Sequence, residues 1–155
     1  MKTSAVLSRC GTYRYALRRV WDPARPLVLF VCLNPSTADA CNEDQTSRVC
    51  INYAKRWGFG GLLIANLFAF RSTDPAGLRS AADPVGPRNN YWIRRLQREA
   101  ALTVCAWSDL GALRGRDAEV LPWLQAPHCL ERLRSGRPGH PLYKKADLLP
   151  QPLFI

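Results

Sequence analysis

Long runs of apolar residues predict three buried strands. The runs are LVLFVCL at residues 27–33, GLLIANLFAF at 61–70 and LTVCAW at 102–107. Apolar runs without regular alternation are typical of strands that helices cover on both faces, as in a parallel sheet. A shorter stretch, HCLERL at residues 128–133, predicts a last strand or strand-like segment.

Apolar residues at helical spacing separate these runs. Val49, Tyr53 and Trp57 lie four residues apart and Gly58 follows them, which predicts an amphipathic helix ending at a glycine. Residues 42–45, NEDQ, predict a capping box at its start. Pro87 opens a second helix over 87–101, and RDAEVLPWL at 116–124 predicts a short third one. A polar loop with one helical turn fills residues 71–87.

Alternation of strands and helices predicts the fold class. We expect an α/β protein, a three-layer αβα sandwich with a mainly parallel central sheet of about four strands. The segment TYRYALRRVWD at residues 12–22 alternates apolar and basic residues, which predicts an N-terminal strand or hairpin with one face in water. At 155 residues the chain is expected to form a single domain, with 148–155 as a C-terminal tail packed on its surface.

The net charge of +10 is unevenly distributed. Residues 1–21 carry five basic groups and no acid, residues 22–83 carry six of each, and residues 84–155 carry eleven basic and six acidic groups. An excess of arginine favours a polyanionic partner such as DNA or another nucleic acid. A merely basic, soluble protein is the alternative.

Several classes of protein are not expected. No apolar run is long enough for a membrane span or a signal peptide, so no membrane association is predicted. The six cysteines form no CxxC pair and there are only two histidines, which argues against a metal site. No Walker loop and no GxGxxG, GxSxG or HExxH motif is present. We therefore expect a reduced, cytoplasmic protein without metal or cofactor.

Polar residues follow the first two buried strands. The motif NPSTADA at residues 34–40 comes directly after the first strand, and Asn66 ends the second. Carboxyl ends of parallel strands form one edge of a sheet, where ligands bind. The alternatives are a turn that caps the first strand, and an Asn66 amide that bonds to neighbouring backbone. The candidate ligand-binding residues here are Asn34, Pro35, Ser36, Thr37, Asp39, Asn66 and Phe68.

Later segments carry candidate nucleic-acid contacts. His140 stands in a Pro- and Gly-rich turn beside aromatic and basic residues, a setting suited to an anion; an exposed turn without a role is the alternative. The helix after Pro87 presents a basic arc that is relevant only if it shares a side with the strand ends. The candidate nucleic-acid contacts are Arg71, Arg88, Arg94, Arg95, Arg98, Pro141, Leu142, Tyr143 and Lys144.

Four segments resemble a bacterial and phage family, domain of unknown function 1643. They are LFVCLNPSTADA (29–40), CINYAKRWGFGGLLIANLFAFRSTDP (50–75), AADPVGPRNN (81–90) and GHPLY (139–143). The resemblance extends from about Tyr13 to Asp147 and implies no particular activity.

The order of three motifs is also similar to that of the uracil-DNA glycosylase superfamily, in its mismatch-specific branch. The motifs are CLNPS, ANLFA and GHPLY. This resemblance implies that Asn34 positions the attacking water, Asn66 recognises a flipped base, and His140 supports charge on the leaving base. Pro141 and Leu142 would enter the DNA, with Phe68 as a candidate aromatic wall, whereas Ser36 and Leu142 replace the usual Gly and Ser.

Three functional hypotheses follow. The first is a metal-free hydrolase that cleaves the N-glycosidic bond of a modified or mismatched base, with Asn34 and His140 as catalytic residues. The second is a binding module that reads DNA or a modified base without chemistry. The third is an enzyme that acts on a free nucleotide or another small molecule.

Overall fold

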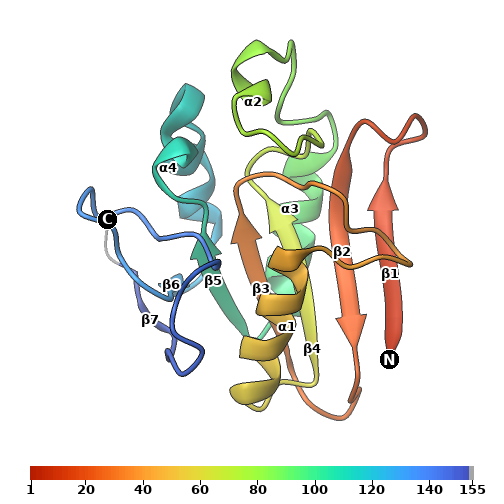
Figure 1. Ribbon diagram of the computed structural model, residues 1–155, viewed down its shortest axis with the longest axis vertical. Coiled ribbons are helices and arrows are strands. Elements are labelled where there is room, and N and C mark those ends of the chain that lie inside the picture. The colour runs from red at the N-terminus through yellow and green to blue at the C-terminus, as the bar shows by residue number, and fades with distance from the viewer. Residues whose placement is uncertain (154–155) are drawn as a thin grey trace.

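A mixed sheet of seven strands forms the centre of the computed structural model, which describes residues 1–153 (Figure 1). The strand order is β1-β2-β4-β3-β5-β6-β7. Strands β4, β3, β5 and β6 are parallel to one another, while β1–β2, β2–β4 and β6–β7 pair antiparallel. The strands are β1 (Lys2–Leu7), β2 (Arg14–Val20), β3 (Leu27–Cys32), β4 (Gly61–Asn66), β5 (Leu102–Ala106), β6 (His128–Cys129) and β7 (Gln151–Pro152).

The expected α/β class is confirmed, but the expected sheet, mainly parallel with about four strands, is wrong. Three of the six strand pairings are antiparallel, and all three involve strands added beyond the parallel centre. A short turn joins β1 to β2, so the two can only form an antiparallel hairpin, and β2 then joins the sheet beside β4. At the other edge β7 comes from the predicted tail; residues 154–155 of that tail lie outside the described part of the chain.

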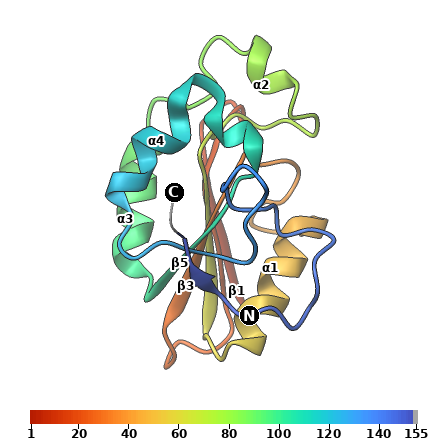
Figure 2. The ribbon, with the colours of Figure 1, turned by 90° about the vertical axis from the view of Figure 1, so that its left-hand side faces the viewer.

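Helices cover both faces of the sheet (Figure 2). Helix α1 (Gln45–Arg56) lies on one face, and α3 (Asn89–Glu99) with α4 (Arg116–Val120) on the other. The short α2 (Gly77–Ser80) stands within the predicted polar loop, beyond the strand ends, and 3₁₀ turns η1 (Asp109–Gly115) and η2 (Leu121–Trp123) flank α4. No helix within residues 1–153 is long and apolar enough to cross a membrane.

The core has two parts because the central strands bury both faces. Leu29 and Val31 of β3 pack on the α3 side, whereas Val28 and Phe30 pack on the α1 side. All four side chains are fully buried. Burial on both faces is the physical reason that these strands have no polar alternation in the sequence.

The N-terminal hairpin departs from its expected solvated face. Arg14 and Arg19 are buried, with 3% and 1% of their surface exposed. Arg19 Nε donates to Glu43 Oε2 at 2.8 Å, and Arg14 Nη1 donates to the Ala38 carbonyl at 2.9 Å. Because the loop between β3 and α1 folds over this face of β2, Arg14 and Arg19 are covered rather than exposed.

The start of α1 also differs from the predicted capping box at Asn42 and Gln45. Asp44 is the N-cap: its Oδ1 accepts from Ser47 N at 2.8 Å, and Ser47 Oγ accepts from Asp44 N at 3.0 Å. Asn42 instead donates to the Asp39 carboxylate. The carboxylate two residues further on is therefore the one that caps the orphan N–H groups of the helix. The helix end is as predicted, since Gly58 takes the left-handed conformation (φ +85°) after it.

Candidate functional site

A small polar cavity lies where β3 and β4 end against the first turn of α1. Cys32 of β3 is in register with Asn66 of β4, so the residues following both strands lie at one edge of the sheet. The cavity has a volume of about 30 Å³. It is lined by Arg14, Cys32, Asn34, Pro35, Ser36, Asp44, Thr46, Ser47, Ile64, Asn66 and His140.

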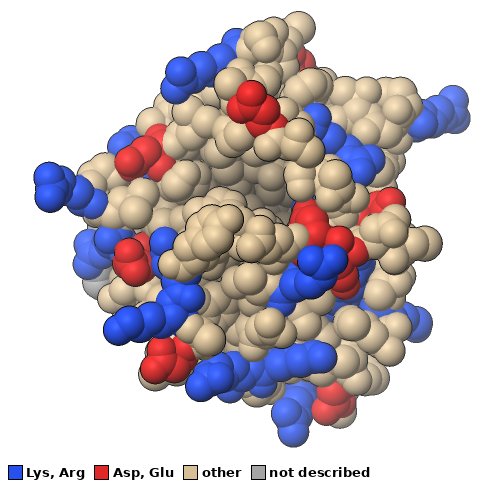
Figure 3. Space-filling model, in the orientation of Figure 1, with Lys and Arg blue, Asp and Glu red and all other residues tan. Residues whose placement is uncertain are grey.

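A wider cleft of about 250 Å³ shares part of this lining. Asn34, Ser36, Asp44, Thr46 and His140 belong to both spaces, so the cleft leads to the inner cavity. Figure 3 shows the face hollowed between the α2 segment and α1, with both acidic and basic side chains scattered over the surface around it. The remaining residues of the cleft are Gln45, Ser72, Thr73, Pro75 and Leu142.

The side-chain nitrogen of Asn66, which lines the inner cavity, has no hydrogen-bond partner among residues 1–153. Asn66 is 2% exposed, and its Nδ2 is buried without a hydrogen bond. Its backbone is held firmly, because Asn89 Nδ2 donates to the carbonyls of Asn66 at 2.9 Å and Leu67 at 3.0 Å. A buried amide without a partner is costly, so the side chain is placed to receive a ligand or a water molecule.

Arg14 supplies a buried positive charge beside this amide. Its Nε is buried without a hydrogen bond, and no carboxylate within residues 1–153 forms an ion pair with it. Burial lowers the pKa of Arg14 to about 10, while the negative charge of Asp44 partly offsets that effect. The guanidinium is therefore charged at neutral pH, and one of its donors is buried without a partner in a residue that lines the cavity.

Asp44 is a carboxylate at the mouth of the cavity whose hydrogen-bonding positions are already used. Its Oδ2 accepts from Ser36 Oγ at 3.1 Å and from Ala38 N at 3.4 Å, in addition to the helix cap at Oδ1. Burial alone would raise the pKa of Asp44, but the hydrogen bonds from Ser47 and Ser36 and the charge of Arg14 outweigh it, and the net shift is downward.

The NPS turn is fixed from the loop that follows β4. Asn34 Nδ2 donates to the carbonyls of Ser72 at 2.9 Å and Pro35 at 3.2 Å. Arg71 Nε donates to the Ser36 carbonyl at 3.2 Å. These bonds occupy the nitrogen of the Asn34 amide and leave its oxygen as an acceptor at the cleft.

His140 reaches the same cavity from the far end of the chain. Its Nδ1 accepts from Leu142 N at 3.2 Å, so the neutral ring carries its proton on Nε2. Burial lowers the pKa of His140 below its ordinary value, and the nearby Lys144 charge adds to this effect, while Asp44 opposes it. The ring is therefore neutral at pH 7 and offers an N–H donor.

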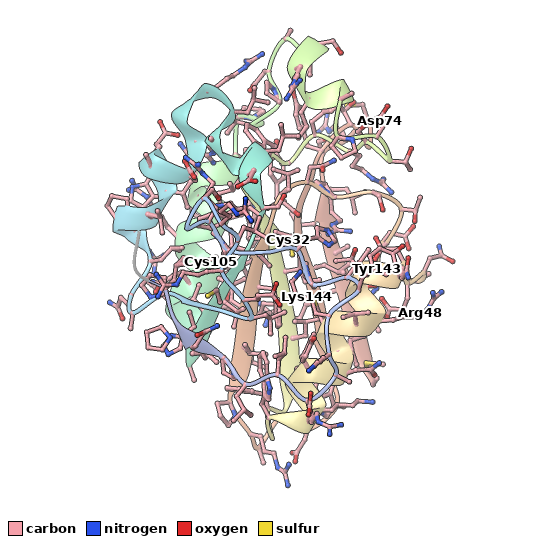
Figure 4. All side chains as sticks on the ribbon, turned by 60° about the vertical axis from the view of Figure 1, so that its left-hand side comes forward. Cys32, Arg48, Asp74, Cys105, Tyr143 and Lys144 are labelled. Atoms are coloured by element: carbon pink, nitrogen blue, oxygen red, sulfur yellow. The ribbon has the colours of Figure 1, made fainter. Side chains whose placement is uncertain are left out.

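The segment after His140 is tied to α1. Tyr53 Oη donates to the Lys145 carbonyl at 2.7 Å, and Trp57 Nε1 donates to the Leu148 carbonyl at 2.9 Å. Pro141 is buried and Leu142 half-buried, whereas Tyr143 is 90% exposed with a left-handed backbone (φ 61°). In Figure 4, Tyr143 lies on the outer side of this segment near the first turns of α1, and Cys32 lies in the interior.

Some residues predicted for the site lie outside it. Thr37 is exposed and lines neither space, and the Asp39 carboxylate accepts from the N–H groups of Cys41 and Asn42 within its own turn. Phe68 is fully buried in the core on the α3 side of the sheet. The residues that do come together are Asn34, Pro35, Ser36, Asn66, His140 and Leu142.

The predicted basic arc on α3 lies on the face of the sheet opposite the cavity (Figure 2). Its guanidinium groups lie over aromatic rings: Arg94 is 4.2 Å from the centre of the Trp123 ring and Arg95 is 5.0 Å from that of Trp92. Arg88 precedes the helix near Tyr91, and Arg98 is exposed. This arc does not reach the cleft, and Arg71 is the predicted basic residue that contacts the motif.

Metal-ligating side chains do not cluster in the part of the chain that the structure describes. No group of three or more His, Cys, Asp or Glu side chains is arranged there to hold a metal ion. All six cysteines are free thiols, and burial raises the pKa of Cys50 and Cys105.

Arg14, Asp44, Thr46 and Ser47 line the inner cavity but were not among the site residues predicted from the sequence. Arg14 belongs to a segment whose alternation indicates a solvated strand, and nothing local distinguishes it from Arg18. Asp44 and Ser47 had a signal, because an acidic residue followed three positions later by serine can form a reciprocal cap, but Asn42 and Gln45 matched the usual form better.

The chain matches one known protein family. No curated protein and no solved structure matches the chain. The family described as "Protein of unknown function (DUF1643)" matches residues 14–142, a range that runs from Arg14 to Leu142 and so includes the lining of the inner cavity. Since this range covers most of the chain, the protein belongs to the DUF1643 family.

Proposed function

We propose that the cleft binds a nucleobase of a nucleic acid and that the protein hydrolyses the N-glycosidic bond of that base. The observation that carries the proposal is the unpartnered Nδ2 of Asn66, a residue that is 2% exposed and lines the inner end of a polar cleft. An amide presents one donor and one acceptor, which is the complement of a base edge. The cleft has room for a planar ring outside the inner cavity.

Two residues at the cleft suit the chemistry. The free oxygen of Asn34 can accept a hydrogen bond from a water molecule and orient it toward the sugar. The water oxygen forms a bond to C1′ as the C1′–N bond breaks, the electron pair of that bond leaves with the base, and the water proton passes to solvent. The N–H of neutral His140 then stabilises the negative charge on the departing base.

The net charge of +10 supports a nucleic acid rather than a free base as the substrate. The face shown in Figure 3 carries both basic and acidic side chains, so the support for this substrate is the net charge of the chain as a whole. The similarity of the CLNPS, ANLFA and GHPLY motifs to the uracil-DNA glycosylase superfamily supports the same activity.

A glycosylase assay tests the proposal directly. Labelled single-stranded and duplex oligonucleotides carry uracil, hypoxanthine, or an oxidised or alkylated base, and abasic product is measured. We expect product with at least one base, and a loss of about a hundredfold or more in rate for Asn34→Ala. Asn90→Ala is the matched control, because Asn90 is exposed on α3 at the opposite face. Absence of abasic product from the wild-type protein with every base would refute the hydrolase.

A second candidate is a binding module that reads the base without breaking a bond. One observation favours it: Asp44 is the one carboxylate lining either space, and all its bonds go to the protein. No carboxylate at the cleft is therefore free to act as a general base toward the attacking water. This candidate predicts oligonucleotide binding that weakens with salt, is lost in Asn66→Ala and yields no product.

A further inference from the structure

A groove of about 430 Å³ lies between the N-terminal hairpin and the start of α3, on the α3 side of the sheet. Within residues 1–153, no residue lines both this groove and the cleft or its inner cavity. Ligand-binding clefts have volumes of about 300–1,000 Å³, so the groove is large enough for a ligand. Apolar side chains form most of its walls: Val6, Leu7, Tyr15, Pro87 and Trp92.

Packing between the hairpin and the segment before α3 fixes the shape of the groove. Tyr13 Oη donates to the Asp83 carbonyl at 2.8 Å, and the rings of Tyr13 and Tyr15 stack with their centres 6.0 Å apart. Gly86, with φ +91°, leaves room for both rings, because a Cβ atom there would lie 3.0 Å from Tyr13 and 3.1 Å from Tyr15. The wall that Tyr15 contributes is therefore formed before any ligand binds.

Two arginines that line the groove have no carboxylate partner. Arg9 and Arg88 are exposed, and neither forms an ion pair within residues 1–153. Arg95 follows Arg88 by two helical turns, so basic groups continue along the same side of α3. Glu99 lies further along, 2.9 Å from Arg18 and 3.9 Å from Arg95. The groove itself therefore favours an anionic ligand.

Aromatic rings lie beside these charges. Trp92 lines the groove and is half-buried, with the Arg95 guanidinium 5.0 Å from its ring centre. Tyr91 is 50% exposed, with Arg88 6.0 Å from its ring centre, and its hydroxyl accepts from Arg95 Nη1 at 3.3 Å. Unpaired bases stack on aromatic rings, and phosphates bind arginine. Single-stranded nucleic acid matches both properties, whereas the bases of a duplex are already stacked on one another.

The turn between β1 and β2 connects the groove to the cleft. Ser8 and Arg9 of this turn line the groove. Arg71 N donates to the Thr12 carbonyl at 3.0 Å, and Arg71 Nε donates to the Ser36 carbonyl at the cleft at 3.2 Å. A strand with one base in the cleft can therefore reach the groove by crossing this turn.

We propose that the groove binds the part of a single strand that continues from the cleft, with bases stacked on Trp92 and phosphates bound by Arg9 and Arg88. The proposal rests on the proposed function, because it adds a second binding surface for the same substrate and names its single-stranded form. The groove takes no part in the chemistry.

Fluorescence anisotropy with strands of two lengths tests the groove. Each short strand carries one base of the glycosylase panel between single dA nucleotides, and the long strands add a run of dA on the 5′ or the 3′ side. With at least one base, we expect one long strand to bind about tenfold more tightly than the short strand. A run of abasic sites in place of dA should give a gain of less than about threefold.

Two groove variants should abolish the gain and leave the Kd of the short strand unchanged. They are Trp92→Leu and the double variant Arg9→Gln with Arg88→Gln. The matched control is Arg25→Gln with Arg56→Gln, which removes the same charge from exposed positions that line neither the groove nor the cleft. This control should keep the gain.

The outcomes separate the groove from the cleft. A gain that survives both groove variants, an equal loss in the control, or an equal gain from abasic sites would refute the groove. A change of oligomeric state in Trp92→Leu, measured by sedimentation, would make the groove an interface between copies of the chain and also refute it. If Asn66→Ala binds the short strand as the wild type does, the proposed function fails, and the groove variants still decide the groove. If no strand binds, both fail. The arginine variant decides the matter if Trp92→Leu does not fold.

Discussion

Two buried arginines lie on opposite faces of the sheet and differ in how the protein satisfies them. Arg116 is 2% exposed and, like Arg14, has one buried nitrogen without a partner (Nη2), but it pairs with Glu119, donates from Nε to the Leu67 carbonyl at 2.8 Å, and lies 5.7 Å from the centre of the Trp123 ring. Arg14 is equally buried but has one backbone acceptor and no ion pair. Burial of an arginine is therefore no sign of a ligand site. A buried arginine without a counter-ion beside a cavity is such a sign.

The strongest test of this comparison is the stability of the two variants Arg116→Met and Arg14→Met. Arg116→Met should lower the free energy of unfolding by about 2–4 kcal/mol, since it removes an ion pair, a buried hydrogen bond and a cation–π contact. Arg14→Met should change it by less than about 1 kcal/mol, because the lost bond is offset by relief of an uncompensated buried charge. Urea unfolding measures both. An equal loss in the two variants would mean that Arg14 is structural as well.

Asn89→Ala tests whether the α3 side holds the cavity residue in place. The variant removes both bonds to the carbonyls of Asn66 and Leu67 and should cost about 1–3 kcal/mol. Loosening the end of β4 should also weaken oligonucleotide binding, although Asn89 lines neither the cavity nor the cleft. Asn90→Ala is the control in the same helix turn. If Asn89→Ala lost stability but bound oligonucleotides as the wild type does, Asn89 would have no influence on the cavity.

The smallest expected effect is the pH dependence contributed by His140. Because the pKa of His140 is lower in the folded protein than its ordinary value of 6.5, the unfolded chain binds a proton first as the pH falls. The folded state should therefore lose stability as the pH drops from 6.5 to the pKa of His140 in the folded protein. Above pH 6.5 this residue should contribute no pH dependence to the stability. His140→Gln should show a smaller loss between pH 7.5 and pH 5 in thermal unfolding. An identical loss would show that the ring is not buried against the cleft.

The sequence predicted the parallel centre of the fold better than its edges. Strands β3, β4 and β5 are covered on both faces and therefore need uninterrupted apolar residues. Such runs can be recognised in the sequence. Strand β1, with polar Lys2, Thr3 and Ser4, and the two-residue β7 carry no such requirement, so neither was predicted.

The site was predicted only where its residues follow strands. Asn34 and Asn66 could be placed together because parallel strand ends share an edge. Arg14 could not, because its burial depends on the loop after β3 folding over β2, a contact between segments far apart in the sequence. The position of the α3 arginines on the other face likewise depends on the handedness of the whole chain path rather than on any local pattern.

The bonds that tie residues 145–148 to α1 also have a consequence during protein synthesis. Arg14 leaves the ribosome among the first residues of the β-sheet and His140 long after its central strands, yet both line one cavity. A nascent chain can therefore assemble β1 to β5 while the cavity still lacks one wall. The wall formed by His140 is added only when Tyr53 and Trp57 bind the later segment, so the cavity is the last part of this face to close.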